Sequence, residues 1–382
     1  MIPSTERFLT THTGSLPRPD DLFRMMWAKE EGVPVDQAAL AERVRRAVTE
    51  IVARQRAAGI DIVSDGELSK PSYATYVKAR LAGFGGTTER LALRDLVDFP
   101  GFAARHAAGG GPQRHKRPAC NAPIALADRS GIDEDVANMQ AAIAAAGVPV
   151  GQAFLSAASP GVIALFFANQ HYPSDEAYLE AIAEAMRPEY EAIAAAGLIL
   201  QLDCPDLAMG RHIQFGDLDT ASFLKMARMR VEVLNHATRN IAPERMRLHL
   251  CWGNYEGPHH RDVAIADILA TVFQARPAGI SFEAANPRHA HEWRVFETVK
   301  LPERKVLIPG VLESKSNFIE HPELVADRIG RYANLVGREN VIAGSDCGFS
   351  TFVDTARIDP DIVFAKLQAM AEGARIATKR FW

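Results

Sequence analysis

The fold follows from the stretch RLHLCWGNYEGPHHRDVAIADILATVFQARPAGISFE, residues 247–283. It begins with a short apolar run, Arg247–Cys251, and ends with a second one, Gly279–Glu283. Between them, Arg261–Arg276 has the apolar spacing of an amphipathic helix. Runs of this length predict buried strands, and a helix between two such strands predicts that the strands are parallel.

The same alternation extends over the whole chain. The predicted strands are Phe8–Thr13, Ile60–Ser64, Gln152–Ala157, Leu198–Asp203, Arg247–Cys251, Gly279–Glu283, Lys305–Pro309 and Val341–Ser345. Amphipathic stretches lie between most of them, at Gln37–Ala57, Asp175–Ala196, Thr220–Ala242, Arg261–Arg276 and Pro322–Val336. Eight strand–helix units predict an α/β fold, a (β/α)8 TIM barrel rather than an open doubly wound sheet.

The chain is predicted to form one catalytic domain over residues 1–382. The connection between the second and third strands is long for a barrel loop. Residues from about 81 to 125 are therefore expected to form an insertion that covers the barrel mouth.

Composition narrows the class of protein. Of 382 residues, 47% are hydrophobic and 24% are charged, which is typical of soluble globular chains. The net charge of -4 gives no general attraction to nucleic acid. No apolar run is long enough to span a bilayer, and the N-terminus lacks the pattern of a signal peptide. We expect a cytoplasmic protein with neither nucleic acid nor membrane as a partner.

In such a barrel the active site forms where the strands end, at their carboxyl face. The polar residues at the predicted ends are His12 to Ser15, Asp65 and Glu67, Ser156 and Ser159, Asp203, His249 and Cys251, Glu283, Glu313 and Lys315, and Asp346 and Cys347. The barrel would bring these groups to one rim, although they are spread over the whole sequence.

Four of these residues suggest a metal site. His249 and Cys251 lie two apart on a strand, so both side chains point to the same face. Glu283 and Cys347 end two further strands. Two thiolates, an imidazole and a carboxylate suit tetrahedral zinc, whereas magnesium and calcium prefer oxygen ligands. The alternative is a core histidine beside an unrelated buried cysteine.

This ligand set also indicates a reaction. Two thiolates and a carboxylate make the site anionic, which suits binding of a substrate thiol as a thiolate better than splitting of water. We therefore expect a zinc enzyme that activates a small thiol for alkylation. Glu283 would be the ligand most easily displaced, because it binds through oxygen.

Glu67 and Asp203 form a second candidate group. As a pair of carboxylates they could bind the ammonium group of an amino-acid substrate, and the backbone at Gly14-Ser15 could receive its carboxylate. The alternative is that the two acids cap helices or pair with nearby arginine or lysine side chains.

Several aromatic and histidine residues are open to two interpretations. Trp252, Phe166, Phe167 and Trp293 could stack on a flat cofactor, but such residues more often pack in a core. A second group, His259, His260, His289, His291 and His321, is interpreted as surface histidines, since no thiol supports a second metal site.

The ordered motifs resemble a known family, the cobalamin-independent methionine synthases, in their catalytic barrel. The matching pieces are Thr13-Gly14-Ser15-Leu16-Pro17, Asp65-Gly66-Glu67, Leu200-Gln201-Leu202-Asp203, His249-Leu250-Cys251, Ile280-Ser281-Phe282-Glu283-Ala284-Ala285, Pro309-Gly310-Val311 and Asp346-Cys347-Gly348. They occur in the family's order over nearly the whole chain, as expected for a single-barrel paralogue.

The resemblance implies zinc at His249, Cys251, Glu283 and Cys347. It also implies that Ser15, Glu67 and Asp203 hold homocysteine, which would accept a methyl group from 5-methyltetrahydrofolate. Lys315 lies where the family usually has a proton-transferring histidine, so Lys315 and Asp203 are the candidate catalytic residues.

Two other functions stay open at this stage. One is thiol alkylation of the epoxyalkane:coenzyme M transferase type, and the other is a non-catalytic zinc-binding barrel. A corrinoid protein is an alternative methyl donor, and a homo-oligomer is an open expectation.

Overall fold

The eight apolar runs form the strands of one sheet, and the structure, a computed structural model, describes residues 3–89, 93–108, 116–352 and 358–382. The strands are β1 (Leu9–Thr10), β2 (Val63–Ser64), β7 (Ala153–Ala158), β9 (Ile199–Asp203), β10 (Met246–Leu250), β11 (Gly279–Phe282), β12 (Val306–Leu312) and β13 (Ile342–Ser345). They lie in the order β1-β13-β12-β11-β10-β9-β7-β2, and every pair is parallel.

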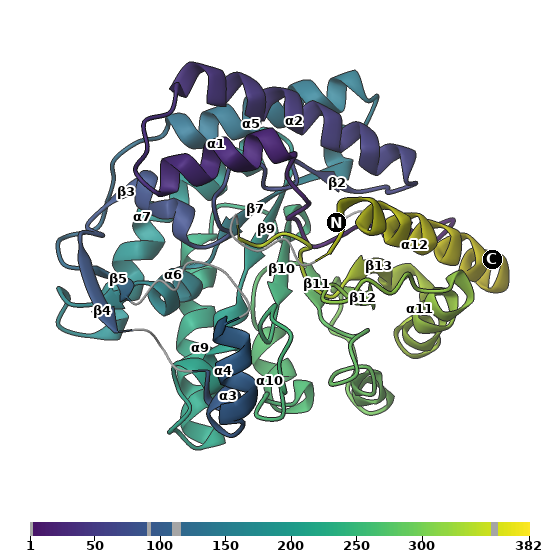
Figure 1. The fold of residues 1–382 in the computed structure, drawn as a ribbon. Helices are drawn as coiled ribbons and strands as arrows, with labels where there is room; N and C mark the ends of the chain where they lie inside the picture. Colours follow the sequence, from purple (N-terminus) through teal and green to yellow (C-terminus); the bar gives the residue numbers. More distant parts are fainter. Residues whose placement is uncertain (1–2, 90–92, 109–115, 353–357) are drawn as a thin grey trace.

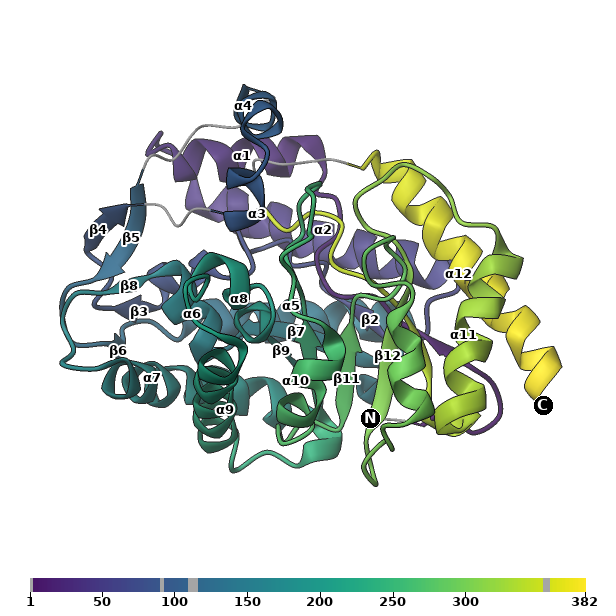
Figure 2. The same ribbon diagram turned by 90° about the horizontal axis from the view of Figure 1, so that it is seen from below.

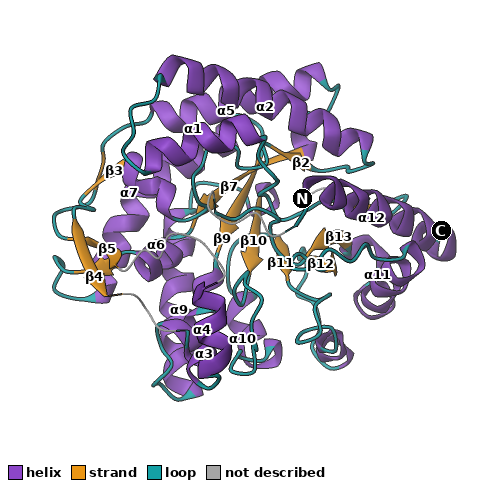
Figure 3. Cartoon of the chain, viewed as in Figure 1, coloured by secondary structure: helices purple, strands orange, loops and turns teal. Residues whose placement is uncertain are grey.

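The two ends of this order meet. The backbone N–H of Ile62 donates to the carbonyl of Thr10 at 3.0 Å, which joins the edge of β2 to β1. The sheet therefore closes, and its helices surround it (Figures 1 and 3). The predicted (β/α)8 barrel is confirmed.

Most of the long surrounding helices begin where the sequence supplies a side-chain cap. The long ones are α1 (Asp20–Glu30), α2 (Gln37–Ala57), α5 (Ser130–Ala145), α7 (Asp175–Ala195), α9 (Thr220–Ala237), α11 (Pro322–Val336) and α12 (Pro360–Phe381). In α2, the Asp36 side chain accepts from the N–H groups of Ala38 and Ala39. Its buried residues Leu40, Val44, Val48 and Ile51 recur at helical spacing, so one stripe packs on the barrel.

Shorter elements complete the ring. These are α6 (Pro160–Phe166), α8 (Gly210–Ile213), α10 (Ile265–Val272), and the 3-10 turns η1 (Thr75–Ala79), η2 (Val150–Gln152), η3 (Pro205–Leu207), η4 (Pro243–Arg245), η5 (Glu292–Glu297) and η6 (Arg338–Asn340). The predicted helix at 261–276 is shorter in the structure, because residues before 265 form a loop held by side-chain hydrogen bonds to Asp262.

The segment between β2 and α5 carries small elements of its own. They are β3 (Leu81–Ala82), β4 (Gly86–Glu89), α3 (Arg94–Val97), α4 (Pro100–Ala108), β5 (Lys116–Cys120) and β6 (Ala125–Leu126). β4 and β5 pair with each other, and β5 also pairs with β8 (Ala168–Asn169). Figures 1 and 2 place β4 and β5 on the side of the barrel opposite α11 and α12. Residues 90–92 and 109–115 of this segment lie outside the described residues.

The barrel interior changes from apolar to polar along its axis. An apolar cluster near the amino ends of the strands consists of Leu9, Ile62, Phe154, Ile199, Val306, Ile308 and Ile342. Above it, the buried guanidinium of Arg247 lies 3.5 Å from the ring centre of Phe154 and donates to Gln201 and Thr11 at 2.7 and 2.8 Å. The apolar core thus fills the amino end of the barrel, and the carboxyl end is left for a polar site.

One further property concerns membranes. Within the described parts of the chain, none of the helices combines the length and the hydropathy needed to cross a bilayer.

Candidate active site

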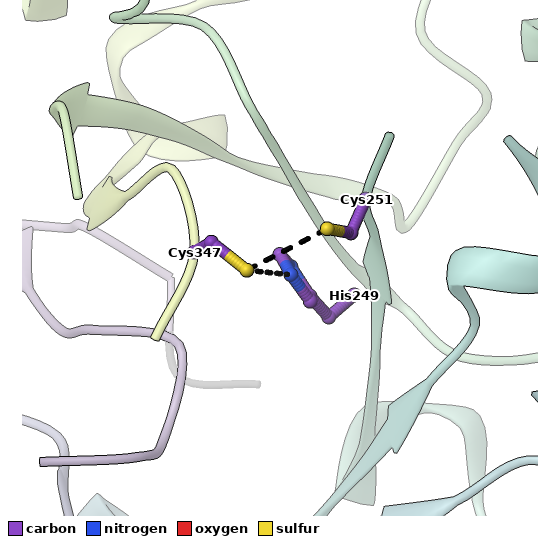
Figure 4. Close-up of side chains that lie close together, drawn as sticks. All are labelled: His249, Cys251 and Cys347. Atoms are coloured by element: carbon purple, nitrogen blue, oxygen red, sulfur yellow. Dashed lines mark hydrogen bonds between the residues drawn. The ribbon is translucent and has the colours of Figure 1, made fainter. Parts of the chain in front are cut away.

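Three potential metal ligands converge at the carboxyl end of the barrel (Figure 4). His249 lies on β10, Cys251 follows that strand, and Cys347 follows β13. The Cys251 and Cys347 sulfurs are 3.5 Å apart, and the Cys347 sulfur lies 3.7 Å from Nε2 of His249. Their ligand atoms all lie within 4.8 Å of one another, and all three side chains are buried. Strand pairing therefore brings together residues almost a hundred positions apart.

Neighbouring groups orient two of these side chains, those of His249 and Cys251. Ser281 is paired with His249 across β10 and β11, and its hydroxyl lies 3.3 Å from Nδ1 of His249. This contact turns Nε2 toward Cys347. The backbone N–H of Gly253 donates to the Cys251 sulfur at 3.2 Å. Hydrogen bonds from neighbouring groups to metal ligands are common, because they fix the orientation of the histidine ring and of the cysteine sulfur.

The protonation chemistry also fits a cation. Burial lowers the pKa of His249 to about 4, so its imidazole is neutral and keeps a lone pair for a metal. The shared contact with Cys347, together with burial, raises the pKa of Cys251 well above its ordinary value. Two buried sulfurs can lie this close as thiolates only beside a positive charge. Sulfur and nitrogen donors in a group of this size suit zinc.

Glu283 lies close to this group, but its carboxylate faces other partners. Oε1 accepts from the backbone N–H of Trp252 at 2.9 Å. Oε2 accepts from Asn286 Nδ2 and from the Lys315 ammonium, each at 2.9 Å. Among the described residues, the cluster of mutually close ligand atoms holds His249 and the two cysteines without Glu283. The assignment of Glu283 as a ligand stays a prediction.

Lys315 is nearly buried and forms an ion pair with Glu283. Burial alone would lower the pKa of Lys315, but the carboxylates of Glu283 and Asp346 outweigh it and raise the pKa above its ordinary value. Burial by itself would raise the pKa of Glu283. The charge of Lys315 outweighs burial, so the pKa of Glu283 lies below its ordinary value. Both groups are therefore charged. The catalytic role of Lys315 stays a prediction.

The second candidate group, Glu67 and Asp203, adjoins the first. Asp203 is paired with His249 across β9 and β10, so the two side chains point to the same face of the barrel wall. Burial and the charge of Glu67 raise the pKa of Asp203 well above its ordinary value. Burial also raises the pKa of Glu67. Asp203 accepts from Gln201 Nε2 at 2.8 Å, whereas Oε2 of Glu67 is buried and has no hydrogen-bond partner in the described part of the chain.

Gly14 and Ser15 lie against this acid pair. Gly14 has a φ of 141°, and a Cβ at this position would collide with the Glu67 carboxylate, so the backbone can approach the acid only as glycine. The Ser15 carbonyl accepts from the N–H of Phe349 at 2.9 Å, and its hydroxyl accepts from the N–H of Ser350 at 3.4 Å. The loop after β1 thus contacts both the acid pair and the segment that follows Cys347.

Methionine synthases recur among the known proteins that this chain resembles. The chain is 24% identical to a methionine synthase of Thermococcus kodakarensis over 371 residues, which cover 97% of this chain and 93% of the relative. It is also 24% identical over 405 residues to a 2-hydroxypropyl-CoM lyase of Xanthobacter autotrophicus, with coverage of 96% and 94%. A solved B12-independent methionine synthase from Shewanella sp. W3-18-1 superposes with a TM-score of 0.74 at 19% identity, over 98% of both chains. No protein-family model matches the sequence.

The chain is similar over nearly its whole length to methionine synthases, and its fold is that of the B12-independent methionine synthases. Full-length agreement with relatives of similar size fits the order in which the motifs appear at successive strand ends. The relatives include the lyase, so similarity by itself leaves the thiol and the alkyl donor open.

The interpretation of the histidines as surface residues is wrong for two of them. His259 and His289 are buried, whereas His260, His291 and His321 are exposed. His259 Nδ1 and His289 Nε2 lie 2.8 and 3.0 Å from the same carboxylate oxygen of Asp262. The reason is tertiary, because three separate loops pack together behind Trp252.

Sequence reasoning also missed the rest of this cluster. The Nδ1 atom of buried His212 lies 3.2 Å from Asp262, and His289 Nδ1 lies 2.8 Å from Glu292. The His289 ring packs on Trp252 with ring centres 4.2 Å apart. The cluster therefore supports the segment that carries Cys251. In the sequence, the one local indication of this cluster is Asp262, three residues after His259.

Proposed function

We propose that this chain is a zinc-dependent methyltransferase that transfers a methyl group to the thiol of homocysteine. One observation carries the proposal: His249, the centre of a sulfur–nitrogen donor group, is the strand neighbour of Asp203, half of a buried acid pair. A thiol site beside an ammonium site matches the two ends of an amino-acid thiol. The methionine synthase relatives support the same substrate class.

Zinc held by His249, Cys251 and Cys347 would lower the pKa of a substrate thiol while its thiolate ligands keep the sulfur nucleophilic. Glu283, whose Oε1 accepts from the N–H of Trp252 next to Cys251, would serve as a fourth, exchangeable ligand. In the reaction, the substrate sulfur forms a bond to the methyl carbon. The bond from that carbon to the donor breaks, and its electron pair leaves with the donor.

The acid pair would bind the substrate amine. Burial raises the pKa of both carboxyl groups, and repulsion by the negative charge of Glu67 raises that of Asp203 further. An ammonium group between them relieves that repulsion and supplies the partner that Oε2 of Glu67 lacks. In this proposal Asp203 orients the sulfur by holding the amine, and Ser15 receives the carboxylate.

Lys315 has a positioning role in this proposal. The Lys315 ammonium donates to Oε2 of Glu283 at 2.9 Å. This contact keeps the carboxylate turned away from the three metal donors. Because the ion pair favours the protonated lysine, release of a proton to the donor is disfavoured. The donor, 5-methyltetrahydrofolate or a methylcorrinoid, stays open, as do a corrinoid protein partner and a homo-oligomer.

A second function is alkylation of coenzyme M, since the lyase relative is as similar to this chain as the methionine synthase is. Coenzyme M carries a sulfonate and has no ammonium group. Glu67 and Asp203 would repel the sulfonate, so the acid pair favours homocysteine. Titration of the zinc-loaded protein with each thiol separates the two. Binding of coenzyme M without binding of homocysteine would reject the methyltransferase proposal.

The metal site has a direct test. Cys347→Ser should weaken zinc binding by roughly tenfold or more, because it removes one of the convergent sulfur ligands. Zinc content after dialysis against a chelator, measured by mass spectrometry, reports the loss. The matched control is Cys120→Ser, whose buried sulfur lies outside the site and donates to the Ala122 carbonyl. Equal zinc retention in both variants would remove Cys347 from the metal site.

A further inference from the structure

Tyr73 lies beside the site but belongs to neither group described above. It follows β2, in the segment that leads into η1. Its half-buried ring packs edge-on against Phe166 and Phe352, with ring centres 5.8 and 5.7 Å apart. Its neighbour Ser72 forms an antiparallel bridge with Phe352. Tyr73 is therefore held against the segment that follows Cys347.

The Tyr73 hydroxyl has no hydrogen-bond partner in residues 3–89, 93–108, 116–352 and 358–382. Burial raises the pKa of Tyr73 well above its ordinary value, and the negative charges of Cys251, Cys347, Asp203 and Glu67 raise it further. These negative charges keep the phenol protonated. It is an O–H donor without an acceptor among the described residues.

Ser15 and Tyr73 contact the same short segment. Ser15 accepts from the N–H groups of Phe349 and Ser350, and Tyr73 packs on Phe352. Arg18 links the two sides, since its guanidinium donates to the carbonyls of Ser350 and Glu67, each at 3.0 Å. Ser15 and the Tyr73 ring therefore lie against one short segment, from Phe349 to Phe352.

A substrate carboxylate needs donors here, because the surrounding acids and sulfurs repel it. The nearby cations already donate to oxygens of the protein, although Nε of Arg18 has no partner among the described residues. Arg18 donates to backbone carbonyls, and Lys70 donates to the carbonyl of Ser156. Around the acid pair, the Tyr73 hydroxyl has no acceptor among the described residues, and the same holds for the buried Arg18 Nε and Ser69 Oγ.

We propose that Tyr73 determines substrate specificity: its hydroxyl donates a hydrogen bond to the carboxylate of an amino-acid thiol whose ammonium is held by Glu67 and Asp203. The proposal rests on the function proposed above and adds to it the group that recognises the acid end of the substrate. Tyr73 would thus select amino-acid thiols over amino thiols that lack a carboxylate.

Tyr73→Phe tests this with two ligands. Homocysteine has both groups, and 3-aminopropane-1-thiol is the same molecule without the carboxylate. In calorimetric titrations of zinc-loaded protein, the variant should bind homocysteine about tenfold more weakly, the size expected for one hydrogen bond to a charged group. Its affinity for 3-aminopropane-1-thiol should change by less than about twofold.

The controls separate this effect from loss of structure. Tyr172→Phe removes a hydroxyl that accepts from the N–H of Ile124 outside the site, and it should leave both affinities unchanged. If Tyr73→Phe unfolds early, Tyr73→Leu removes the same hydroxyl. Equal weakening of both ligands, or an unchanged homocysteine affinity, would overturn the role of Tyr73. Wild-type protein that binds neither thiol would instead reject the proposed function, and the Tyr73 proposal with it.

Discussion

Glu67 shows at the scale of one residue how the site depends on backbone conformation. Its φ is 57°, in the left-handed region that side chains other than glycine rarely adopt, and it follows Gly66 with a φ of 68°. A non-glycine residue in this region costs on the order of 1 kcal/mol or more. The strained turn carries the Glu67 carboxylate toward Gly14. Because Gly14 has no side chain, it leaves room for the carboxylate. Strain of this kind is common at functional sites.

His289 gives a pH prediction at the same scale. Burial lowers its pKa, but hydrogen bonds to Asp262 and Glu292 outweigh burial and raise the pKa from 6.5 to about 9. A raised pKa stabilises the folded chain fully below about pH 6.5, and this contribution is lost as the pH rises through about 9. The full contribution is on the order of 3 kcal/mol.

His289→Gln should therefore reduce the fall in unfolding free energy between about pH 6 and about pH 9.5. Urea unfolding at each pH measures the free energy. His291→Gln, an exposed histidine two residues away, is the matched control and should keep the wild-type slope. A wild-type slope in His289→Gln would mean that the charged imidazole contributes nothing to stability.

At the scale of elements, α3 is tied to the loop that follows Cys251. The hydroxyl of Tyr255 donates to Asp95 on α3, and the N–H of His259 donates to the same carboxylate at 3.2 Å. Asp95 is fully buried. A four-residue helix has little stability of its own, so these contacts hold the described part of the 81–125 segment against the barrel.

Tyr255→Phe should loosen that segment without loosening the barrel. Hydrogen exchange of residues 94–108 is expected to speed up by about tenfold, the effect of one lost buried hydrogen bond to a carboxylate, while β7 and β9 keep their protection. Asp98→Ala is the control, because Asp98 pairs with Arg261 on the exposed surface. A larger effect in Asp98→Ala would place the attachment at the surface pair.

At the scale of the whole molecule, closure of the barrel depends on the short contact between β1 and β2, called the seam below. β1 and β2 contain two residues each, so few backbone hydrogen bonds join them. Asp61 reinforces the seam: its carboxylate accepts from the N–H of Thr10 at 2.9 Å and pairs with Arg7 at 2.7 Å. The first and second strands of the barrel meet through these contacts.

Asp61→Ala should lower the unfolding free energy by about 2–4 kcal/mol, because it leaves the buried Thr10 N–H without a partner and breaks the Arg7 pair. Urea unfolding of the full chain measures the change. The control is Asp361→Ala, which removes an exposed partner of Arg54 and should cost less than about 1 kcal/mol. A similar small loss in both variants would show that other contacts close the barrel.

The sequence by itself determined the strands, their parallel arrangement and the rim at which the polar residues lie. Hydrophobic periodicity and turn residues are local, so α2 and α11 begin and end at the predicted residues. The convergence of His249, Cys251 and Cys347 also followed from the sequence, because a closed barrel brings its strand ends to one rim.

Only the tertiary structure decided which partners the side chains choose at that rim. Glu283 faces Lys315 and Trp252, Tyr73 packs against Phe166 and Phe352, and two histidines expected at the surface surround Asp262. These outcomes depend on distances between loops that are far apart in the sequence. Periodicity places a residue on a face, but packing of separate loops sets the rotation of its side chain and its neighbours.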